Sequence, residues 1–389
     1  MRKYNFFDSY HFKSGLKVNN RIVMSPMTTY SSFFDGTITG DEIKYYRMRS
    51  GPGLVITSCA NVDKNGKGFE GELGAYEDRF ISGLTKVANA IHFRGSKAIL
   101  QIFSAGRKSN SKVLRGNKPY SASAIADPRP GMEKPRELKS SEIEKIIKDF
   151  GKAALRGIQA GFDGIELHGA NTYLLQQFFS PHSNRRTDKW GGNLQKRMRF
   201  PLAVIEEVRK VIKSYAPSNF ILGYRISPEE LETPGIRLPD TLKFVDRLSD
   251  SPIDYLHTSM GDYRRTSLND KKDREEINQK ILKVINHRIP LIEVGSIITP
   301  KQAEDVLNKG GTFAALGREL IREPNWVAKV KSGDEKSIRK QLAPSEMDEL
   351  GIPGGLQRNL LTDLPGPINF TNETSQNYLN HPAPMENLT

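Results

Sequence analysis

The stretch Gly161-Phe162-Asp163-Gly164-Ile165-Glu166-Leu167-His168-Gly169-Ala170-Asn171-Thr172-Tyr173 decides the fold. Residues 162–167 have the length and character of a buried strand, and His168, Asn171 and Tyr173 follow its end. Barrel enzymes keep their chemistry at such strand ends. An imidazole and an amide together can hold a carbonyl oxygen, and a tyrosine can supply a proton. Taken alone, the three residues could equally just satisfy backbone groups in a loop.

The same alternation of short apolar runs and longer amphipathic stretches continues along the chain. It predicts strands at residues 21–24, 53–58, 98–102, 162–167, 220–226, 254–258, 291–294 and 313–316. It predicts helices at residues 41–49, 81–93, 141–160, 194–215, 238–248, 275–285, 301–308 and 326–331. Near-continuous apolar strands separated by helices favour a parallel sheet that is covered on its outer face. Eight such units indicate a single α/β domain, a (β/α)8 TIM barrel.

Local signals set the expected boundaries. Ser140-Ser141 is a cap signal for the third helix, and Thr299-Pro300 is one for the seventh. Two long excursions, 103–136 and 180–193, are expected to form substrate walls or lids on the C-terminal face of the barrel. We expect a barrel domain over residues 1–340 and a C-terminal extension over 341–389 that packs on the barrel or on a neighbouring subunit, or is partly disordered.

Composition excludes several classes of protein. The single cysteine among 389 residues rules out a disulfide framework and cysteine-ligated metal sites, and we expect no metal. No signal peptide or membrane span is recognised, so we expect a cytoplasmic protein without a membrane partner. The net charge of +13 is spread over separate segments that also contain acids, so we expect no nucleic acid as partner. A homo-oligomer stays open.

A second group of candidate residues lies late in the chain. Gly295-Ser296 follows the seventh predicted strand and Gly317-Arg318 follows the eighth. In barrels these two loops, with the helix start that follows, commonly bind a phosphate through backbone N–H groups and a cation. The alternative is that the glycines only permit tight turns and that Arg318 is a surface cation.

Other strand ends should meet at the same mouth of the barrel. Ser25-Pro26-Met27-Thr28-Thr29-Tyr30 follows the first strand, Ala60 follows the second, and Gln101 and Arg225 belong to the third and fifth. An amide and a guanidinium facing a flavin ring would hold its pyrimidine edge. Each residue alone could be structural. His257 lies near the mouth without an evident partner, and nothing beside Cys59 clearly lowers the pKa of its thiol.

Longer motifs join these candidates. They are Ser25-Pro26-Met27-Thr28, Gln101 with Ala105-Gly106-Arg107, the 161–170 stretch, Tyr173-Leu174-Leu175-Gln176-Gln177-Phe178, Ser180-Pro181, Asn184-Arg185-Arg186-Thr187-Asp188, Gly191-Gly192, Arg197 and Arg199-Phe200. In this order they resemble the Old Yellow Enzyme family of FMN-dependent NADH or NADPH oxidoreductases. The resemblance covers roughly residues 5–335.

The resemblance implies a role for each candidate. Ser25, Pro26, Met27, Thr28, Ala60, Gln101, His168 and Arg225 would contact the flavin, and Gly295, Ser296, Gly317 and Arg318 would hold the FMN phosphate. His168 and Asn171, with Tyr30 nearby, would bind a small electrophilic substrate, and Tyr173 would be the proton donor. The implied activity is reduction of activated C=C bonds in enones or quinones, and of nitro compounds, in a ping-pong cycle with NADH or NADPH.

The chain departs from many relatives at three places. Phe103-Ser104 stands where many have Trp-His, Thr172 replaces a common Gly, and Lys189-Trp190 replaces an acidic residue followed by Tyr. These changes weaken inference about the substrate more than about the flavin. Two alternatives remain at this stage: a flavin-independent, phosphate-binding barrel lyase or isomerase, and a flavin-binding protein without catalytic activity.

Overall fold

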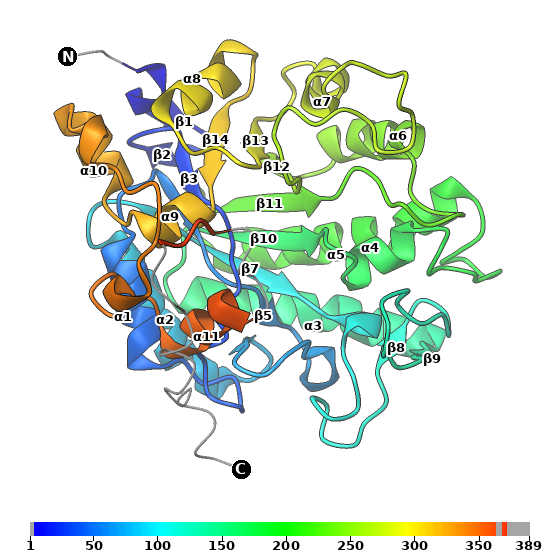
Figure 1. The fold of residues 1–389 in the computed structure, drawn as a ribbon. Helices are drawn as coiled ribbons and strands as arrows, with labels where there is room; N and C mark the ends of the chain where they lie inside the picture. Colours follow the sequence, from blue (N-terminus) through cyan, green and yellow to red (C-terminus); the bar gives the residue numbers. More distant parts are fainter. Residues whose placement is uncertain (1–3, 363–367, 372–389) are drawn as a thin grey trace.

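A closed barrel of parallel strands forms the centre of the molecule (Figure 1). The computed structural model describes residues 4–362 and 368–371. Neighbouring strands pair in parallel around the barrel, and the last pairs with the first to close it. In barrel order the strands are β3 (Ile22–Met24), β4 (Leu54–Ile56), β7 (Lys97–Phe103), β10 (Gly164–Gly169), β11 (Ile221–Ile226), β12 (Tyr255–Thr258), β13 (Leu291–Val294) and β14 (Phe313–Leu316). The predicted TIM barrel is therefore confirmed.

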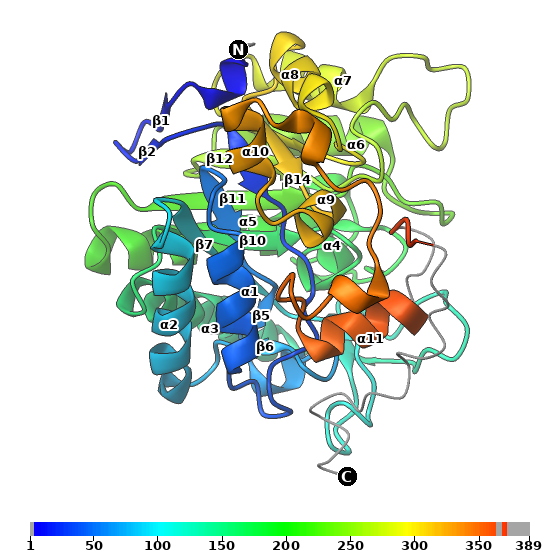
Figure 2. The ribbon, with the colours of Figure 1, turned by 60° about the vertical axis from the view of Figure 1, so that its left-hand side comes forward.

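Helices follow the strands and cover the outside of the barrel (Figure 2). They are α1 (Gly40–Met48), α2 (Ile81–His92), α3 (Ser140–Gln159), α5 (Leu194–Tyr215), α6 (Leu238–Ser249), α7 (Ile277–Ile285), α8 (Pro300–Asn308) and α10 (Trp326–Ser332). Three helices were not expected from the sequence: α4 (Leu174–Phe179), α9 (Arg318–Arg322) and α11 (Gly354–Thr362). The first two are too short to show a helical period.

The start of α3 corrects one expected cap. Lys139, and not Ser140, is the N-cap residue, and its backbone N–H donates to Glu142 Oε2 at 2.8 Å. The cap signal of Thr299 is confirmed, because its hydroxyl and the Gln302 side chain satisfy each other's backbone N–H groups.

Short strands and turns complete the fold. They are β1 (Tyr10–His11), β2 (Lys17–Val18), β5 (Ala60–Asn61), β6 (Leu73–Gly74), β8 (Tyr120–Ser121) and β9 (Arg136–Glu137). The 3-10 turns are η1 (Asn5–Phe7), η2 (Lys64–Gly66), η3 (Asp78–Phe80), η4 (Gly106–Lys108), η5 (Glu335–Ser337) and η6 (Pro344–Glu346). The hairpin β1–β2 lies at the N-terminal end of the barrel, where Phe12 joins the residues that fill the interior.

Alternation along the strands divides the barrel interior into two zones. Inward positions near the strand starts are apolar, such as Ile99, Ile221 and Phe313, and form one packed cluster. The neighbouring residues Leu100 and Leu222 point outward and pack under the helices. The inward register that begins at Ile99 continues to Gln101 near the C-terminal ends of the strands, where the interior becomes polar. This polar end is where the predicted site residues lie.

The described part of the C-terminal extension packs on the barrel. Leu350, Leu356 and Leu360 are buried in the same hydrophobic core as the barrel helices. The Arg49 guanidinium of the α1 C-cap donates to Leu350 O at 3.0 Å and to Ile321 O at 3.1 Å. Figure 2 shows α11 beside α1 on the outside of the barrel. Leu342, which precedes α11 in the chain, forms an isolated parallel β-bridge with Phe370.

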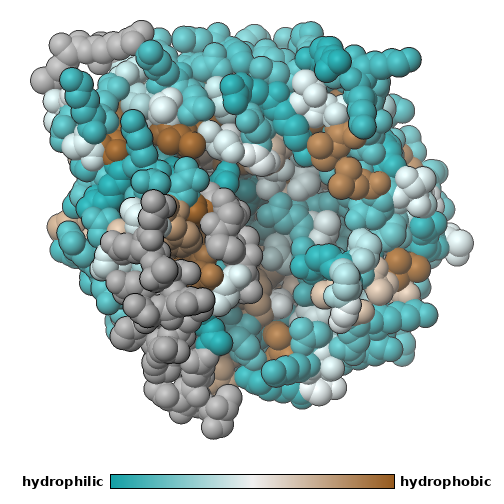
Figure 3. Space-filling model, in the orientation of Figure 1, coloured by the Kyte–Doolittle hydropathy of each residue, from teal (hydrophilic) through white to brown (hydrophobic). Residues whose placement is uncertain are grey.

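The outer surface is mainly polar on the face drawn in Figure 3, with hydrophobic residues in small, separate patches. Across the described residues, no helix combines the length and the apolar character that a membrane crossing requires.

Candidate active site

Two adjoining cavities lie at the C-terminal ends of the strands. The larger, about 400 Å³, includes Ser25, Gly295, Ser296, Gly317 and Arg318 in its walls. The smaller, about 50 Å³, is lined by Pro26, Met27, Thr28, Cys59, Gln101, His168, Asn171, Tyr173 and Arg225. Pro26, Met27 and Arg225 line both. The structure thus brings the predicted phosphate residues and the predicted catalytic residues to two ends of one continuous site.

Two predicted site residues lie outside these walls. Ala60 is fully buried in β5, where it pairs with Ile102 of β7, and its neighbour Cys59 lines the smaller cavity instead. Tyr30 packs its ring against Phe69 at 5.1 Å between centroids, beside the cavities but not in their walls. Its backbone has a φ of 51°, and it passes close to Gly71 and Gly355.

His168 is positioned as a neutral hydrogen-bond donor. It is the inward residue of β10 opposite Arg225 of β11, and it is 3% exposed. Burial, and then the charge of Arg225, holds the pKa of His168 well below its usual range. Its Nδ1 accepts from the backbone N–H of Ala170 at 3.4 Å, so the single proton of the neutral ring belongs on Nε2. That N–H is available to a substrate oxygen.

Asn171 is held so that its amide nitrogen is the free end. Its Oδ1 accepts from the Ser259 hydroxyl at 2.7 Å and from Ser227 at 3.4 Å, and its backbone N–H donates to Ser227 Oγ at 2.9 Å. The Asn171 backbone has a φ of 56° and that of Thr172 a φ of 61°. Left-handed conformations at consecutive residues other than glycine are strained, and such strain is typical of functional turns. Glycine at position 172 would adopt this conformation without such strain.

Tyr173 keeps its proton in this environment. Burial raises the pKa of the phenol well above its usual value, and nearby Cys59 adds to the effect. The ring stands edge-on to His168, with 4.8 Å between centroids, and edge-on to Phe103 at 4.7 Å. A protonated phenol beside a neutral imidazole can give up a proton to a reacting atom.

Phe103-Ser104 changes one wall of the site. Phe103 places an apolar ring against Tyr173, while the Ser104 hydroxyl hydrogen-bonds to Tyr120 Oη at 2.7 Å. Tyr120 in turn donates to Asp63 Oδ2 at 2.6 Å. Burial raises the pKa of Asp63 to about 6. The small hydroxyl of Ser104 therefore bonds within the protein, and Ser104 does not line the smaller cavity.

A buried polar network lies beneath the smaller cavity. Glu166 accepts from Gln101 Nε2 at 2.7 Å and pairs with His257 Nδ1 at 2.9 Å, so His257 does have a partner, contrary to the sequence-based expectation. Burial alone would raise the pKa of Glu166, but His257 and then Arg225 hold it below the usual value. The Nε atom of Arg225 is buried and lacks a hydrogen-bond partner among the described residues. A buried guanidinium nitrogen without a partner fits a ligand that accepts from it.

The predicted phosphate loops are shaped for close approach. Gly295 has a φ of 133°, and a Cβ there would lie 2.7 Å from backbone atoms of Asp262 and Tyr263. Ser296 has a φ of 49°, and its hydroxyl donates to Gly261 O at 2.7 Å and accepts from Arg318 at 3.0 Å. This group of backbone, hydroxyl and guanidinium matches the donors that hold a phosphate.

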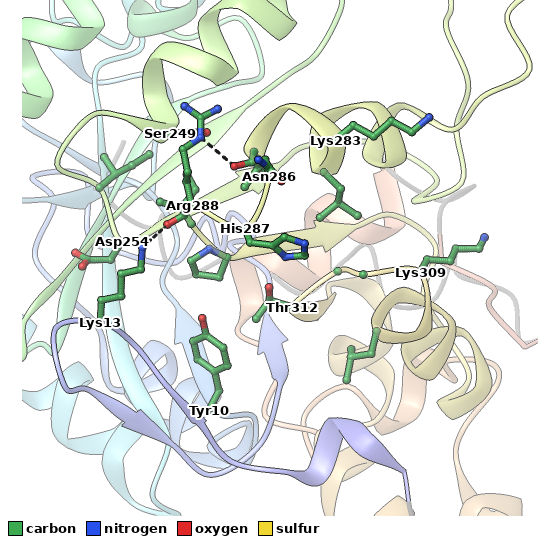
Figure 4. Close-up of a pocket in the computed structure, with 18 of the residues that line it drawn as sticks. Tyr10, Lys13, Ser249, Asp254, Lys283, Asn286, His287, Arg288, Lys309 and Thr312 are labelled. Atoms are coloured by element: carbon green, nitrogen blue, oxygen red, sulfur yellow. Dashed lines mark hydrogen bonds between the residues drawn. The ribbon is translucent and has the colours of Figure 1, made fainter.

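A further cavity of about 740 Å³ lies at the opposite end of the barrel (Figure 4). It is lined by residues that precede β12, β13 and β14, including Asp254, Arg288 and Thr312. None of the predicted site residues lines it. Arg288 is paired with Asp246 and Asp250, both at 2.7 Å. The candidate active site at the C-terminal ends of the strands is therefore separate from this cavity.

Comparison with known proteins shows similarity to flavin oxidoreductases. The model of the NADH:flavin oxidoreductase / NADH oxidase family matches residues 5–337. The chain belongs to this family. The NADH:acrylate oxidoreductase of Vibrio harveyi is 45% identical over 350 residues, which cover 89% of this chain but only 35% of that protein. A probable NADH-dependent flavin oxidoreductase of Bacillus subtilis (strain 168) is 42% identical over 348 residues, which cover 89% of this chain and 93% of that protein.

The structural comparison supports the same assignment of fold. The structure of an Old Yellow Enzyme homologue from Zymomonas mobilis has a TM-score of 0.74 and 23% identity, and the match covers 97% of this chain and 99% of that one. The resemblance to the Old Yellow Enzyme family inferred from the sequence is confirmed. Membership of a flavin oxidoreductase family also implies a flavin and NAD(P)H, in agreement with the two adjoining cavities.

Several residues that line the cavities were not among the predicted site residues. Cys59 was considered only for the reactivity of its thiol, although its position shortly after the end of β4 was a usable signal. Asn369, which lines the larger cavity, comes from a tail without periodicity, so no sequence signal marked it.

Proposed function

We propose that the chain is an FMN-dependent oxidoreductase that takes electrons from NADH or NADPH and reduces activated C=C bonds. The observation that carries this proposal is the continuous site with phosphate donors at one end and a His168/Asn171/Tyr173 group at the other. The larger cavity offers Ser296 and Arg318 to a single phosphate group, which supports FMN as the flavin.

Gly295, Ser296, Gly317 and Arg318 would hold the phosphate of a flavin, which when bound would supply hydride transfer from NAD(P)H to the β carbon of an acceptor. His168 Nε2–H and the amide of Asn171 hold the acceptor's oxygen and stabilise the negative charge that develops on it. Tyr173 gives the proton that the α carbon requires. Arg225, whose Nε has no partner among the described residues, lines both cavities and would hold the flavin ring there through its guanidinium.

The acceptor is proposed as an alkene conjugated to a carbonyl group, with quinones and nitro compounds as further candidates. The name of the Vibrio harveyi relative refers to acrylate, an α,β-unsaturated acid. Because this chain spans 35% of that protein, the name alone does not locate acrylate at this barrel. The oxygen-binding pair and the proton donor are the local support for an α,β-unsaturated acceptor.

The test is anaerobic flavin reduction with each nucleotide, followed by addition of acceptors. We expect a yellow protein whose flavin absorbance disappears with NADH or NADPH and returns when 2-cyclohexen-1-one is added. A protein that stays colourless after incubation with FMN would overturn the proposal in favour of a phosphate-binding barrel of another kind. A yellow protein that neither nucleotide bleaches would instead indicate flavin binding without this catalysis.

A further inference from the structure

Lys108 reaches the catalytic group from the long loop that follows β7. It is the last residue of η4, directly after Ala105-Gly106-Arg107. Its Nζ donates to the backbone carbonyl of Asn171 at 3.3 Å, and it lies 5.5 Å from the ring centroid of Tyr173. A positive charge therefore stands beside both the proposed oxygen-binding residue and the proposed proton donor.

No carboxylate pairs with Lys108 within the described part of the chain. The nearby carboxylate, Asp127, is already bound to Arg129, whose Nε lies 2.7 Å from Asp127 Oδ1. The Arg107 guanidinium, which also lies close by, bonds to the Ala126 carbonyl at 3.0 Å. Burial, and then the charge of Arg129, lowers the pKa of Lys108. Around Lys108 itself, two neighbouring cations, Arg107 and Arg129, are thus set against the single carboxylate of Asp127.

The ammonium also has hydrogen-bonding capacity to spare. A lysine ammonium has several N–H donors, and among the described residues only the Asn171 carbonyl accepts from it. A carboxylate oxygen bound there would complete these donors and neutralise a half-buried charge. A carboxylate conjugated to a C=C bond is a poor hydride acceptor because it is already negative, and a fixed cation beside it offsets that charge.

We propose that Lys108 is a specificity-determining residue, which selects acceptors that carry a carboxylate next to the reacting double bond. The inference rests on the proposed function, because it concerns the acceptor bound at the same site. The competing explanation is that Lys108 only fixes the turn at Asn171. That role would affect neutral and anionic acceptors alike.

The test compares ligands of the same shape that differ in charge. Benzoate and benzamide are titrated into the flavin-loaded protein by calorimetry, and cinnamate and cinnamamide are compared as acceptors by kcat/KM. We expect Lys108→Met to weaken benzoate binding and to lower kcat/KM for cinnamate by about tenfold or more, as loss of a partly buried charge pair does. The neutral amides should change less than about threefold, within the range of a weak surface contact.

Two variants keep the result interpretable. Lys108→Arg keeps the charge and should restore most of the discrimination. Lys112→Met removes an exposed lysine from the same loop and should leave both ligand pairs unchanged. Flavin reduction by NADH is measured in the same variants as a separate readout of the nucleotide half-reaction.

The possible outcomes separate the two proposals. Equal losses for benzoate and benzamide, or no loss for either, would overturn the role of Lys108 while leaving flavin chemistry intact. A loss of NADH-dependent flavin reduction in Lys108→Met would assign the lysine to nucleotide binding and also overturn the inference. A protein that binds no flavin would overturn the proposed function, and this inference with it.

Discussion

At the scale of single residues, the site works by keeping protons in defined places. Buried His168 is neutral with its proton on Nε2, and buried Tyr173 retains its phenol proton. These two assignments follow from burial and from one backbone hydrogen bond, so they need no bound ligand. In the proposed reaction, His168 therefore holds the oxygen of the acceptor and Tyr173 donates the proton.

Tyr173→Phe tests that division. We expect acceptor reduction to slow by about 10²–10⁴-fold, because one proton donor to the transition state is lost. Flavin reduction by NADH should remain close to that of the parent protein. Rapid-mixing absorbance measurements of the two half-reactions separate these effects. Tyr76→Phe, which removes a surface phenol bonded to Asp35 O, is the matched control, and equal slowing of both half-reactions by Tyr173→Phe would refute the assignment.

Thr172→Gly tests the strain in the neighbouring turn. A β-branched residue with a φ of 61° is strained, and its hydroxyl is buried without a partner among the described residues. We expect Gly to increase the free energy of unfolding by about 1 kcal/mol, the net of relieved left-handed strain and the added flexibility of glycine. Urea unfolding measures this change. Thr172→Ala keeps the strain and should gain little, so a gain as large as that of Gly would contradict this explanation.

At the scale of secondary-structure elements, the strands and main helices of the barrel could be predicted from the sequence, whereas the extra helices α4, α9 and α11 could not. α5 begins and ends at the predicted residues because it has a clear hydrophobic period, and β13 and β14 do so because each is a short, mostly apolar run with marked ends. α11 was missed because its contacts come from distant residues, among them Tyr30, and not from a strong period of its own. The site residues at strand ends could be predicted because parallel strands all present that end to one face. Lys108 could not, since the path of a long loop depends on tertiary contacts.

The junction between α11 and the loop after β3 gives an element-scale prediction. A Cβ at Gly355 would lie 1.9 Å from Tyr30 O, so Gly355→Ala must displace either α11 or the Tyr30 turn. We expect a loss of about 1–3 kcal/mol in the free energy of unfolding, typical of overpacking. Thermal and urea unfolding measure it. Gly40→Ala at the start of α1, where a Cβ meets nothing within 4 Å, should not destabilise, and equal behaviour of the two variants would show that α11 does not pack this closely.

At the scale of the whole molecule, buried carboxyl groups make stability depend on pH. Burial raises the pKa of Glu293 to about 8, that of Glu42 to about 7 and that of Asp63 to about 6. At pH values between its ordinary and its raised pKa, each group keeps a proton in the folded state that it has released in the unfolded state. Their contribution to stability is therefore complete below their ordinary pKa values and is lost as the pH rises through the raised ones. We expect these three carboxyl groups to favour pH 5 over pH 8, while the lowered pKa values of buried His168 and His257 act in the opposite direction below pH 6.5.

Glu293→Gln isolates the largest of these effects. Between the ordinary pKa of 4.5 and the raised pKa of about 8, the parent loses about 1.4 kcal/mol per pH unit through this group, and the variant does not. The stability of the variant relative to the parent should therefore increase from pH 5 to pH 8 in urea unfolding. Exposed Glu206→Gln serves as the control. A difference between parent and Glu293→Gln that stays constant with pH would show that Glu293 is ionised in the folded protein.

The walls of the two cavities have a consequence for biosynthesis. The larger cavity is built from Ser25 and Met27, just beyond β3, together with Gly317 and Arg318, just beyond β14. These two strands are the pair that closes the barrel. A chain emerging from the ribosome exposes Ser25 and Met27 long before Gly317 and Arg318, which follow only after the other strands of the barrel have been translated. A ligand that contacts both walls therefore needs the closed barrel, and once bound it holds the first and last strands of the barrel together.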